Sequence, residues 1–248
     1  WGFAAKRYNL LPSDLNFSSS IFTSLLSNTV RMPVQRKRFK KETVRAEVEA
    51  FNEEDVLDEK TLVSFTIQFK PNQEKFSQIE YKEEFDRVVE LAAKYGNAAV
   101  AIKGHTDPSK TLMTLVKTGI KRNIIKRTGQ RGSYKYFMDG KSIRLENTEK
   151  LIKLIQQKKF ESGTEIESPY QVMRAGLELS EQRAEAVKNA IVNYARQRNV
   201  RLESDQIVPI GMGIKEPVIA KPINPEQASE NRRVEFTLVK VSAETVAE

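Results

Sequence analysis

The chain has 248 residues and a formal net charge of +8, with no cysteine and one histidine. Hydrophobic residues make up 39% and charged residues 30%, which is too apolar for a disordered chain and too polar for a membrane protein. The lack of cysteine excludes disulfide scaffolds, Cys-ligated zinc and thiol catalysis, and a single histidine excludes a multi-histidine metal site. No run of about 18 apolar residues occurs, so we expect no transmembrane segment.

The length predicts one domain with an extension, or two small domains. Because the chain begins with Trp1 rather than Met, we expect a processed or truncated piece of a longer protein. We predict an N-terminal extension, or the end of an upstream domain, over residues 1–58, with a weakly alternating strand at 43–51. The remaining residues, 59–248, are predicted to form one domain with a long insertion.

The positive charge is concentrated in that insertion. Residues 108–178 hold fifteen Lys and Arg against seven Asp and Glu, a net charge of +8, while residues 1–60 carry a net charge of +1 and the rest of the chain −1. A basic block is either a solvated surface or a contact surface for nucleic acid, an anionic membrane or an anionic polymer.

The first half of the domain predicts a strand, a helix and a second strand. Residues 62–69 alternate between apolar and polar side chains, which is typical of a half-buried strand. Over 81–92 the apolar residues recur at helical spacing. Residues 98–103 are short and apolar, as in a buried strand, and lead into a polar loop at 104–108.

Within the basic block we predict a short helix, a hairpin and a further helix. The short helix covers 112–116 and ends before Gly119. Asp139 and Gly140 stand between two β-prone runs, which is a strong hairpin signal. Apolar residues at helical spacing follow Asn147 and indicate the further helix.

After the block, Ser180 is predicted to begin a long helix as its N-cap. Residues 206–210 read as a strand that a proline confines to the edge of a sheet. Gly211 and Gly213 are predicted to lie in a loop, and 234–238 alternates as the final strand.

Without the insertion, the order is strand, helix, strand, helix, strand, strand. This order predicts an α+β fold in which the helices pack on one face of a mixed sheet. An insertion of 71 residues between the second strand and the second helix is tolerable if its ends lie close together, because closure entropy grows only with the logarithm of loop length.

Three short islands carry the functional signal. They are Gly104-His105-Thr106-Asp107, then Leu179-Ser180-x-x-Arg183-Ala184, then Asn231-Arg232-Arg233-Val234-Glu235. In this order, each beside a suitable element, they resemble the OmpA-like C-terminal domain family, which binds peptidoglycan in the periplasm of Gram-negative bacteria. The resemblance covers about 60–107 and 178–241, and it implies a βαβαββ sandwich.

The resemblance implies a site for the diaminopimelate residue of the peptidoglycan stem peptide. Asp107 would meet an amino group of diaminopimelate and Arg183 a carboxylate, with Thr106, Arg232 and Arg233 as further contacts. The chemistry is consistent, since a zwitterionic head needs one anionic and one cationic group close together, and a guanidinium fits a carboxylate. We expect no catalytic residue, metal or cofactor.

A local anomaly points to Arg183 independently. With Ser180 as N-cap, Arg183 would be the third helical residue, where Glu or Gln is favoured and where a cation opposes the helix dipole by about 0.3–1 kcal/mol. Such a violation marks a functional candidate. The structural alternatives are that Arg183 pairs with Glu181 or Asp107, that Asp107 only caps a turn, and that His105 is structural.

The function that follows is non-covalent attachment of a larger envelope protein to the cell wall, in the periplasm and in association with the outer membrane or the envelope. Some larger members of the family, with an upstream solute-binding-like module, are similar in this region. Gly176 stands where the family usually has Asn, so a side-chain contact to the ligand or the loop is either missing or supplied from the insertion. The alternative is a nucleic-acid or anionic-polymer binding module that uses the basic insertion. We expect peptidoglycan as the partner, an envelope protein as a candidate partner of the insertion, no nucleic acid and no enzymatic activity.

Overall fold

The computed structural model describes residues 61–95, 98–161, 167–202 and 204–240, together with the two-residue strands β1 (Arg38–Phe39) and β9 (Val246–Ala247), which pair with each other. The predicted extension therefore lies outside the described residues apart from β1, and so does the strand predicted at 43–51. Among the described helices, none is long and apolar enough to cross a bilayer.

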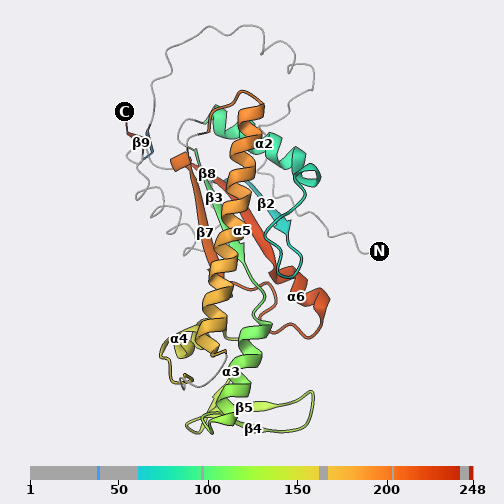
Figure 1. Cartoon of the computed structure of the whole chain (residues 1–248), viewed down its shortest axis with the longest axis vertical. Helices are drawn as coiled ribbons and strands as arrows, with labels where there is room; N and C mark the ends of the chain where they lie inside the picture. Colours follow the sequence, from blue (N-terminus) through green and yellow to red (C-terminus); the bar gives the residue numbers. More distant parts are fainter. Residues whose placement is uncertain are drawn as a thin grey trace.

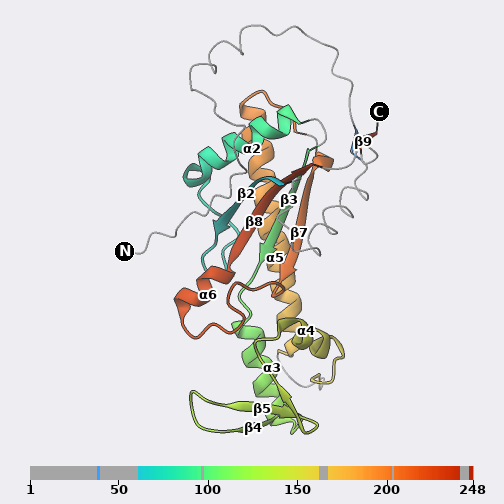
Figure 2. The ribbon, with the colours of Figure 1, turned by 180° about the vertical axis from the view of Figure 1, so that it is seen from behind.

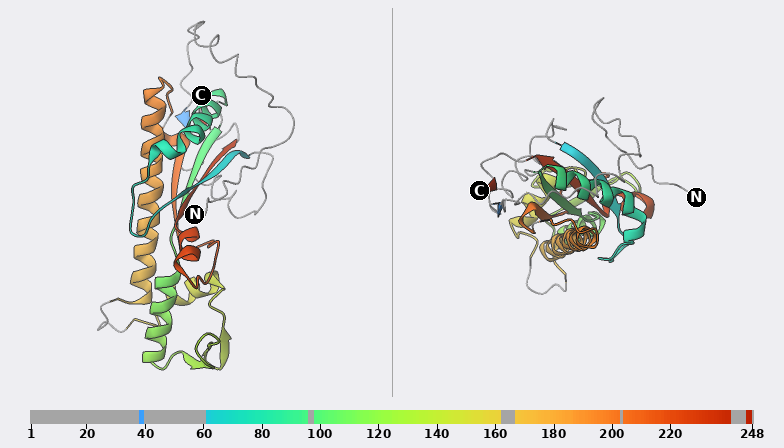
Figure 3. Two further views of the ribbon diagram at one scale, coloured as in Figure 1. Left: turned by 90° about the vertical axis from the view of Figure 1, so that its right-hand side faces the viewer. Right: turned by 90° about the horizontal axis from the view of Figure 1, so that it is seen from above.

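A four-stranded mixed sheet forms the centre of the molecule (Figure 1). Its order is β2-β8-β3-β7; β8 is antiparallel to both neighbours, and β3 is parallel to β7. Helices α2 and α5 both lie on one face of this sheet (Figure 3). The predicted α+β fold is thus confirmed. The elements are β2 (Thr61–Gln68), η2 (Gln78–Tyr81), α2 (Lys82–Lys94), β3 (Ala98–His105), α5 (Pro169–Gln197), η3 (Ser204–Gln206), β7 (Ile207–Gly213) and β8 (Arg233–Lys240).

The main core lies between the sheet and these two helices. Alternate residues of each strand point to the same face, so the period-two pattern buries one set of side chains under the helices. Phe65 of β2 stacks on Phe236 of β8, with ring centroids 4.7 Å apart, and Phe85 of α2 packs against Phe65. Figure 2 shows the other face of the sheet from behind. A smaller buried cluster on that face includes Ala101 and Ile210.

The insertion forms a lobe beyond one end of the sheet, beside the first turns of α5 (Figure 1). It has its own apolar cluster, which includes Leu115, Leu151 and Phe160. In chain order it contains α3 (Ser109–Lys121), β4 (Lys126–Thr128), β5 (Lys135–Met138), β6 (Lys141–Ile143) and α4 (Thr148–Gln156), and β4, β5 and β6 form a three-stranded antiparallel sheet.

The predicted hairpin of the insertion is confirmed. Asp139 and Gly140 both have positive φ, 50° and 76°, as a type I′ turn requires. Asn147 caps α4 by accepting a hydrogen bond from the backbone N–H of Lys150. Helix α3 does not end before Gly119 but runs through it to Lys121. A Cβ on Gly119 would lie 2.5 Å from Ile125 Cδ1, so the glycine makes room for Ile125 to pack against the helix.

The predicted start of the long helix is wrong. Helix α5 begins at Pro169, with Ser168 as N-cap and Gln171 closing a capping box. Ser180 is fully buried in mid-helix, so Arg183 is not in a first turn and the dipole argument for it does not apply. One helix is therefore shared by the insertion and the core.

Two further differences lie near the C-terminus. The edge position of β7 is confirmed, but the strand continues through Gly211 and Gly213, which were predicted to form a loop. A Cβ on Gly211 would make a tight contact of 3.0 Å with the Leu177 carbonyl oxygen, so glycine favours the close approach of β7 to α5. The short helix α6 (Pro225–Asn231) was not predicted, although an N-cap Asn224 followed by proline is its signature.

Candidate functional site

The end of β3 is held tightly against α5. A Cβ on Gly104 would lie 1.9 Å from the carbonyl oxygen of Ser180, so only glycine permits this approach. The Ser180 hydroxyl accepts a hydrogen bond from the Gly213 N–H at 2.9 Å, and the Thr106 N–H donates to the Gly213 carbonyl at 2.7 Å. These contacts fix where the chain leaves the sheet, at Thr106 and Asp107.

Arg183 is a buried structural cation, with 1% of its surface exposed. It donates to three backbone carbonyls, from Nε to Gln73 at 2.9 Å, from Nη1 to His105 at 3.2 Å and from Nη2 to Lys70 at 3.2 Å. Its guanidinium also lies 5.1 Å from the ring centroid of Phe69. The hydrogen bonds of Arg183 go to backbone oxygens, and neither Glu181 nor Asp107 is among its partners.

Asp107 keeps one carboxylate oxygen available. Oδ1 accepts from the Ser109 N–H at 3.1 Å and from the Ser109 hydroxyl at 2.8 Å. This is the turn-capping geometry that Asp often adopts. Oδ2 receives no hydrogen bond from the described residues. The turn therefore orients the carboxylate and leaves a second oxygen for another donor.

A cavity of about 520 Å³ brings the predicted residues together. Thr106, Asp107, Arg183 and Arg232 all line it, and so does Gly176. The volume lies within the range of small-molecule sites, about 300–1,000 Å³. The Thr106 hydroxyl donates to the Gly176 carbonyl at 3.4 Å, and a Cβ on Gly176 would lie 3.1 Å from that hydroxyl oxygen. The glycine thus leaves room inside the cavity.

Arg232 lines the same cavity and differs from Arg183, which gives three N–H groups to backbone carbonyls. The Nε of Arg232 is buried and has no hydrogen-bond partner in the described part of the chain. Burial, and then the charge of Arg232, lower the pKa of Arg183 to about 10, against an upward effect of Glu74. Arg183 is therefore still cationic near neutral pH, and Arg183 and Arg232 line the same cavity.

Arg233 is not among the residues that line this cavity. Arg232 ends helix α6, whereas Arg233 is the first residue of β8, where it donates to Glu235 Oε1 at 2.7 Å and to the Glu216 carbonyl at 3.0 Å. His105 joins the same cluster, with Nδ1 3.2 Å from the Lys215 carbonyl and Nε2 3.5 Å from Glu235 Oε2. The structural interpretation of His105 is thus supported.

The carboxyl of Glu235 titrates unusually low in this cluster. Burial alone would raise its pKa, but the hydrogen bond and charge of His105, with those of Arg233, outweigh burial and lower the pKa to about 2. This cluster stabilises the strand ends on which the cavity is built.

Sequence reasoning missed the part of the cavity that comes from the insertion. Lys110, Thr111, Glu167 and Gln171 also line it, and Lys110 Nζ lies 2.9 Å from Glu167 Oε1. Nothing in the sequence pattern pairs Lys110 with Glu167, since they are far apart in the chain and belong to no shared motif. They meet because α3 and α5 pack side by side.

No protein-family model matches the sequence, and no curated protein matches it. The solved structures similar to this chain include the peptidoglycan-associated lipoprotein of Burkholderia pseudomallei, at 13% identity and a TM-score of 0.38, covering 70% of this chain and 88% of that one. The periplasmic domain of Helicobacter pylori MotB matches at 13% identity and 0.39, over 75% and 80%. The OmpA-like domain of FopA1 from Francisella tularensis matches at 15% identity and 0.37, over 77% and 87%. OmpA-like domains, which the three islands resemble, are thus among the solved structures that are similar to this chain.

Proposed function

We propose that the cavity binds the diaminopimelate of a peptidoglycan stem peptide without covalent chemistry. The observation that carries this proposal is the meeting of an oriented carboxylate, Asp107, with the guanidinium of Arg232 in one cavity. The three islands support it, because each contributes a lining residue.

The roles of the two arginines differ from those that the resemblance implies. Arg183 spends three N–H groups on backbone carbonyls, whereas the Nε of Arg232 has no partner among the described residues. A guanidinium has five N–H donors, so Arg183 keeps two. We assign the ligand carboxylate mainly to Arg232, with Arg183 as a second, more deeply fixed donor, and the ligand ammonium to Oδ2 of Asp107.

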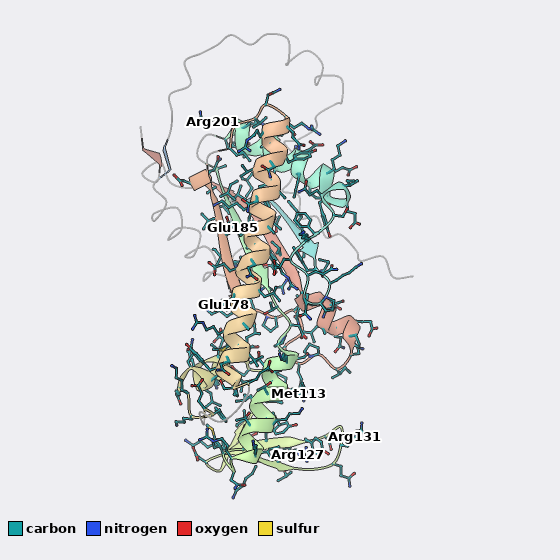
Figure 4. The ribbon with its side chains drawn as sticks, in the orientation of Figure 1. Met113, Arg127, Arg131, Glu178, Glu185 and Arg201 are labelled. Atoms are coloured by element: carbon teal, nitrogen blue, oxygen red, sulfur yellow. The ribbon has the colours of Figure 1, made fainter. Side chains whose placement is uncertain are left out.

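The test is calorimetric titration of the protein with free meso-diaminopimelate. Asp107→Asn keeps an oxygen for the bonds from Ser109 but removes the charge, and Arg232→Met removes the free cation at similar volume. Each should weaken binding about 10- to 100-fold, since a hydrogen bond to a charged group contributes about 1.5–3 kcal/mol. Glu185→Gln, an exposed change on α5 labelled in Figure 4, serves as the matched control. Wild-type affinity in both site variants would refute the assignment.

In this proposal the domain anchors a larger envelope protein to the wall, in the periplasm and in association with the outer membrane or the envelope. The basic insertion gives it a second surface for an acidic partner protein of that compartment. Arg127 and Arg131 are exposed at the far end of the insertion (Figure 4). Arg127→Glu with Arg131→Glu should abolish capture of such a partner while diaminopimelate binding is retained.

Two rival functions can be separated by simple measurements. A nucleic-acid module would bind DNA or RNA at low salt and lose affinity steeply between about 50 and 200 mM salt, whereas a single zwitterion clamp should weaken little. We expect no nucleic-acid binding. An amidase would clear a peptidoglycan gel, and we expect no clearing.

A further inference from the structure

The cavity extends past the clamp residues into the insertion. Its inner part is formed by buried groups, among them Thr106 and Arg183. Its outer part is formed by Lys110 at the start of α3 and by Glu167, next to the N-cap of α5, whose side chains are 61% and 54% exposed. The cavity therefore has a buried zwitterion-binding end and a solvent-facing end with one ion pair across it.

The ion pair at the outer end is easily exchanged. Lys110 Nζ and Glu167 Oε1 are 2.9 Å apart, but an exposed pair of this kind contributes only about 0.2–1 kcal/mol. Lys110 can therefore leave Glu167 for a ligand carboxylate at little cost, while Glu167 remains hydrated. The neighbouring Gln171 side chain is already committed, since its Oε1 accepts from the Ser168 N–H in the capping box.

We infer that the outer end is a second subsite, in which Lys110 binds a carboxylate on the residue next to the clamped zwitterion, so that the ligand is a peptide rather than a free amino acid. Glu167 competes with this carboxylate for Lys110 and tunes the affinity. The inference rests on the proposed function, because the peptide is placed by the clamp of Asp107 and Arg232.

The insertion is thus a specificity element of the cavity and not only a charged surface. Both residues of the pair come from the insertion and line the cavity, Lys110 in the first turn of α3 and Glu167 just before the N-cap of α5. A peptide whose neighbouring carboxylate is amidated would fill the same space without a charge for Lys110.

Two tripeptides test the subsite. One is L-Ala-γ-D-Glu-meso-diaminopimelate, which carries the carboxylate, and the other carries D-isoglutamine, its amide, at the same position. Wild-type protein should bind the acid about two- to fivefold more tightly than the amide, the range that an exposed pair supplies. In Lys110→Met this ratio should fall to about 1, and in Glu167→Gln it should rise, because Lys110 is released from its competitor.

Matched controls separate the subsite from general charge effects. Lys117→Met removes the same charge from an exposed position of α3, and Glu185→Gln removes an exposed carboxylate from α5. Both should keep the wild-type ratio. A wild-type ratio near 1, with free diaminopimelate still bound, would overturn the subsite alone. Failure of free diaminopimelate and of both tripeptides to bind would overturn the proposed function as well.

Discussion

Arg183 Nη1 lies 3.2 Å from the carbonyl oxygen of His105, and this bond joins the middle of α5 to the end of β3. The same guanidinium reaches the carbonyls of Lys70 and Gln73 in the segment after β2. One side chain thus holds together three of the segments that line the cavity. The main role of Arg183 is therefore structural, and only its two remaining N–H groups can contact a ligand.

Replacing Arg183 should therefore mainly reduce stability, whereas replacing Arg232 should mainly reduce ligand binding. Arg183→Met leaves three carbonyls without their donor and should lower the free energy of unfolding by roughly 2–5 kcal/mol. Arg232→Met removes a neighbouring like charge and should change it by less than about 0.5 kcal/mol. Urea unfolding monitored by circular dichroism measures both. Equal losses of stability would contradict the division of roles.

The close approach of Gly104 to Ser180 predicts that Gly104→Ala, which adds one methyl group, reduces both stability and ligand binding. Gly104→Ala would place a carbon 1.9 Å from the Ser180 carbonyl oxygen, and relief requires α5 to move away from β3. Overpacking of this kind costs about 1–3 kcal/mol, and the variant should also lose diaminopimelate binding. Gly176→Ala is the control for stability, since its Cβ would meet only a hydroxyl, at 3.1 Å, and Ala favours a helix. A fully stable Gly104→Ala protein would show that the two elements are not packed as described.

The lowered pKa of Glu235 predicts that the folded protein loses stability in acid. Its pKa is about 2 in the folded protein against an ordinary value of 4.5. A lowered pKa contributes stability that is fully present above pH 4.5 and is lost as the pH falls towards 2. Wild-type protein should lose on the order of 1–3 kcal/mol from this group over that interval. Glu235→Gln should be less stable at pH 7 and lose less on acidification.

Unfolding by urea at pH 7, 4 and 2.5 gives the two profiles for Glu235. Glu185→Gln, at an exposed position, should follow the wild-type profile. If the profile of Glu235→Gln runs parallel to that of the wild type down to the lowest pH, the carboxyl of Glu235 does not have the lowered pKa.

A helix α5 that begins at Pro169 and one that begins after Ser180 predict different effects of Ser168→Ala and Ser180→Ala on amide exchange. Ser168→Ala removes an N-cap and its capping box and should cost about 1 kcal/mol, with faster amide exchange at Gln171. That change loosens the outer wall of the cavity beside Glu167. Ser180→Ala should leave exchange at the first turn of α5 unchanged and act on β7, because the Ser180 hydroxyl accepts from the Gly213 N–H. Hydrogen exchange followed by mass spectrometry distinguishes the two. Protection lost around residue 183 in Ser180→Ala, without change at 169–172, would contradict the helix start at Pro169.

Much of the fold could be predicted because its signals are local. Period-two alternation identified β2 and β8, and Asp139-Gly140 identified a hairpin whose geometry the backbone alone determines. The start of α5 was missed although Ser168, Pro169 and Gln171 carry a local signature of a helix start, with a proline in the first turn and a capping box, which Ser180 lacks. Gly211 was predicted to lie in a loop and instead lies in β7 against α5, because the sequence alone does not distinguish a glycine in a turn from a glycine that allows a close helix contact.

The site was predictable only where a motif carried it. Asp107, Arg183 and Arg232 come from the three islands and do meet in one cavity. Lys110 and Glu167 could not be found, because their pairing depends on how α3 packs against α5. Arg232 and Arg233 are adjacent in sequence, and only the folded structure shows that Arg232 lines the cavity while Arg233 joins the cluster around Glu235.

Helix α5 has 29 residues and, at 1.5 Å per residue, a length of about 43 Å. Its first turns belong to the insertion and its later turns carry Arg183, with unbroken helical backbone between them. A regular helix resists bending, so a sideways force on the basic lobe becomes a torque at the contact between Gly104 and Ser180. A displacement of the insertion would therefore be transmitted along α5 to the contact with β3, next to Thr106 and Asp107.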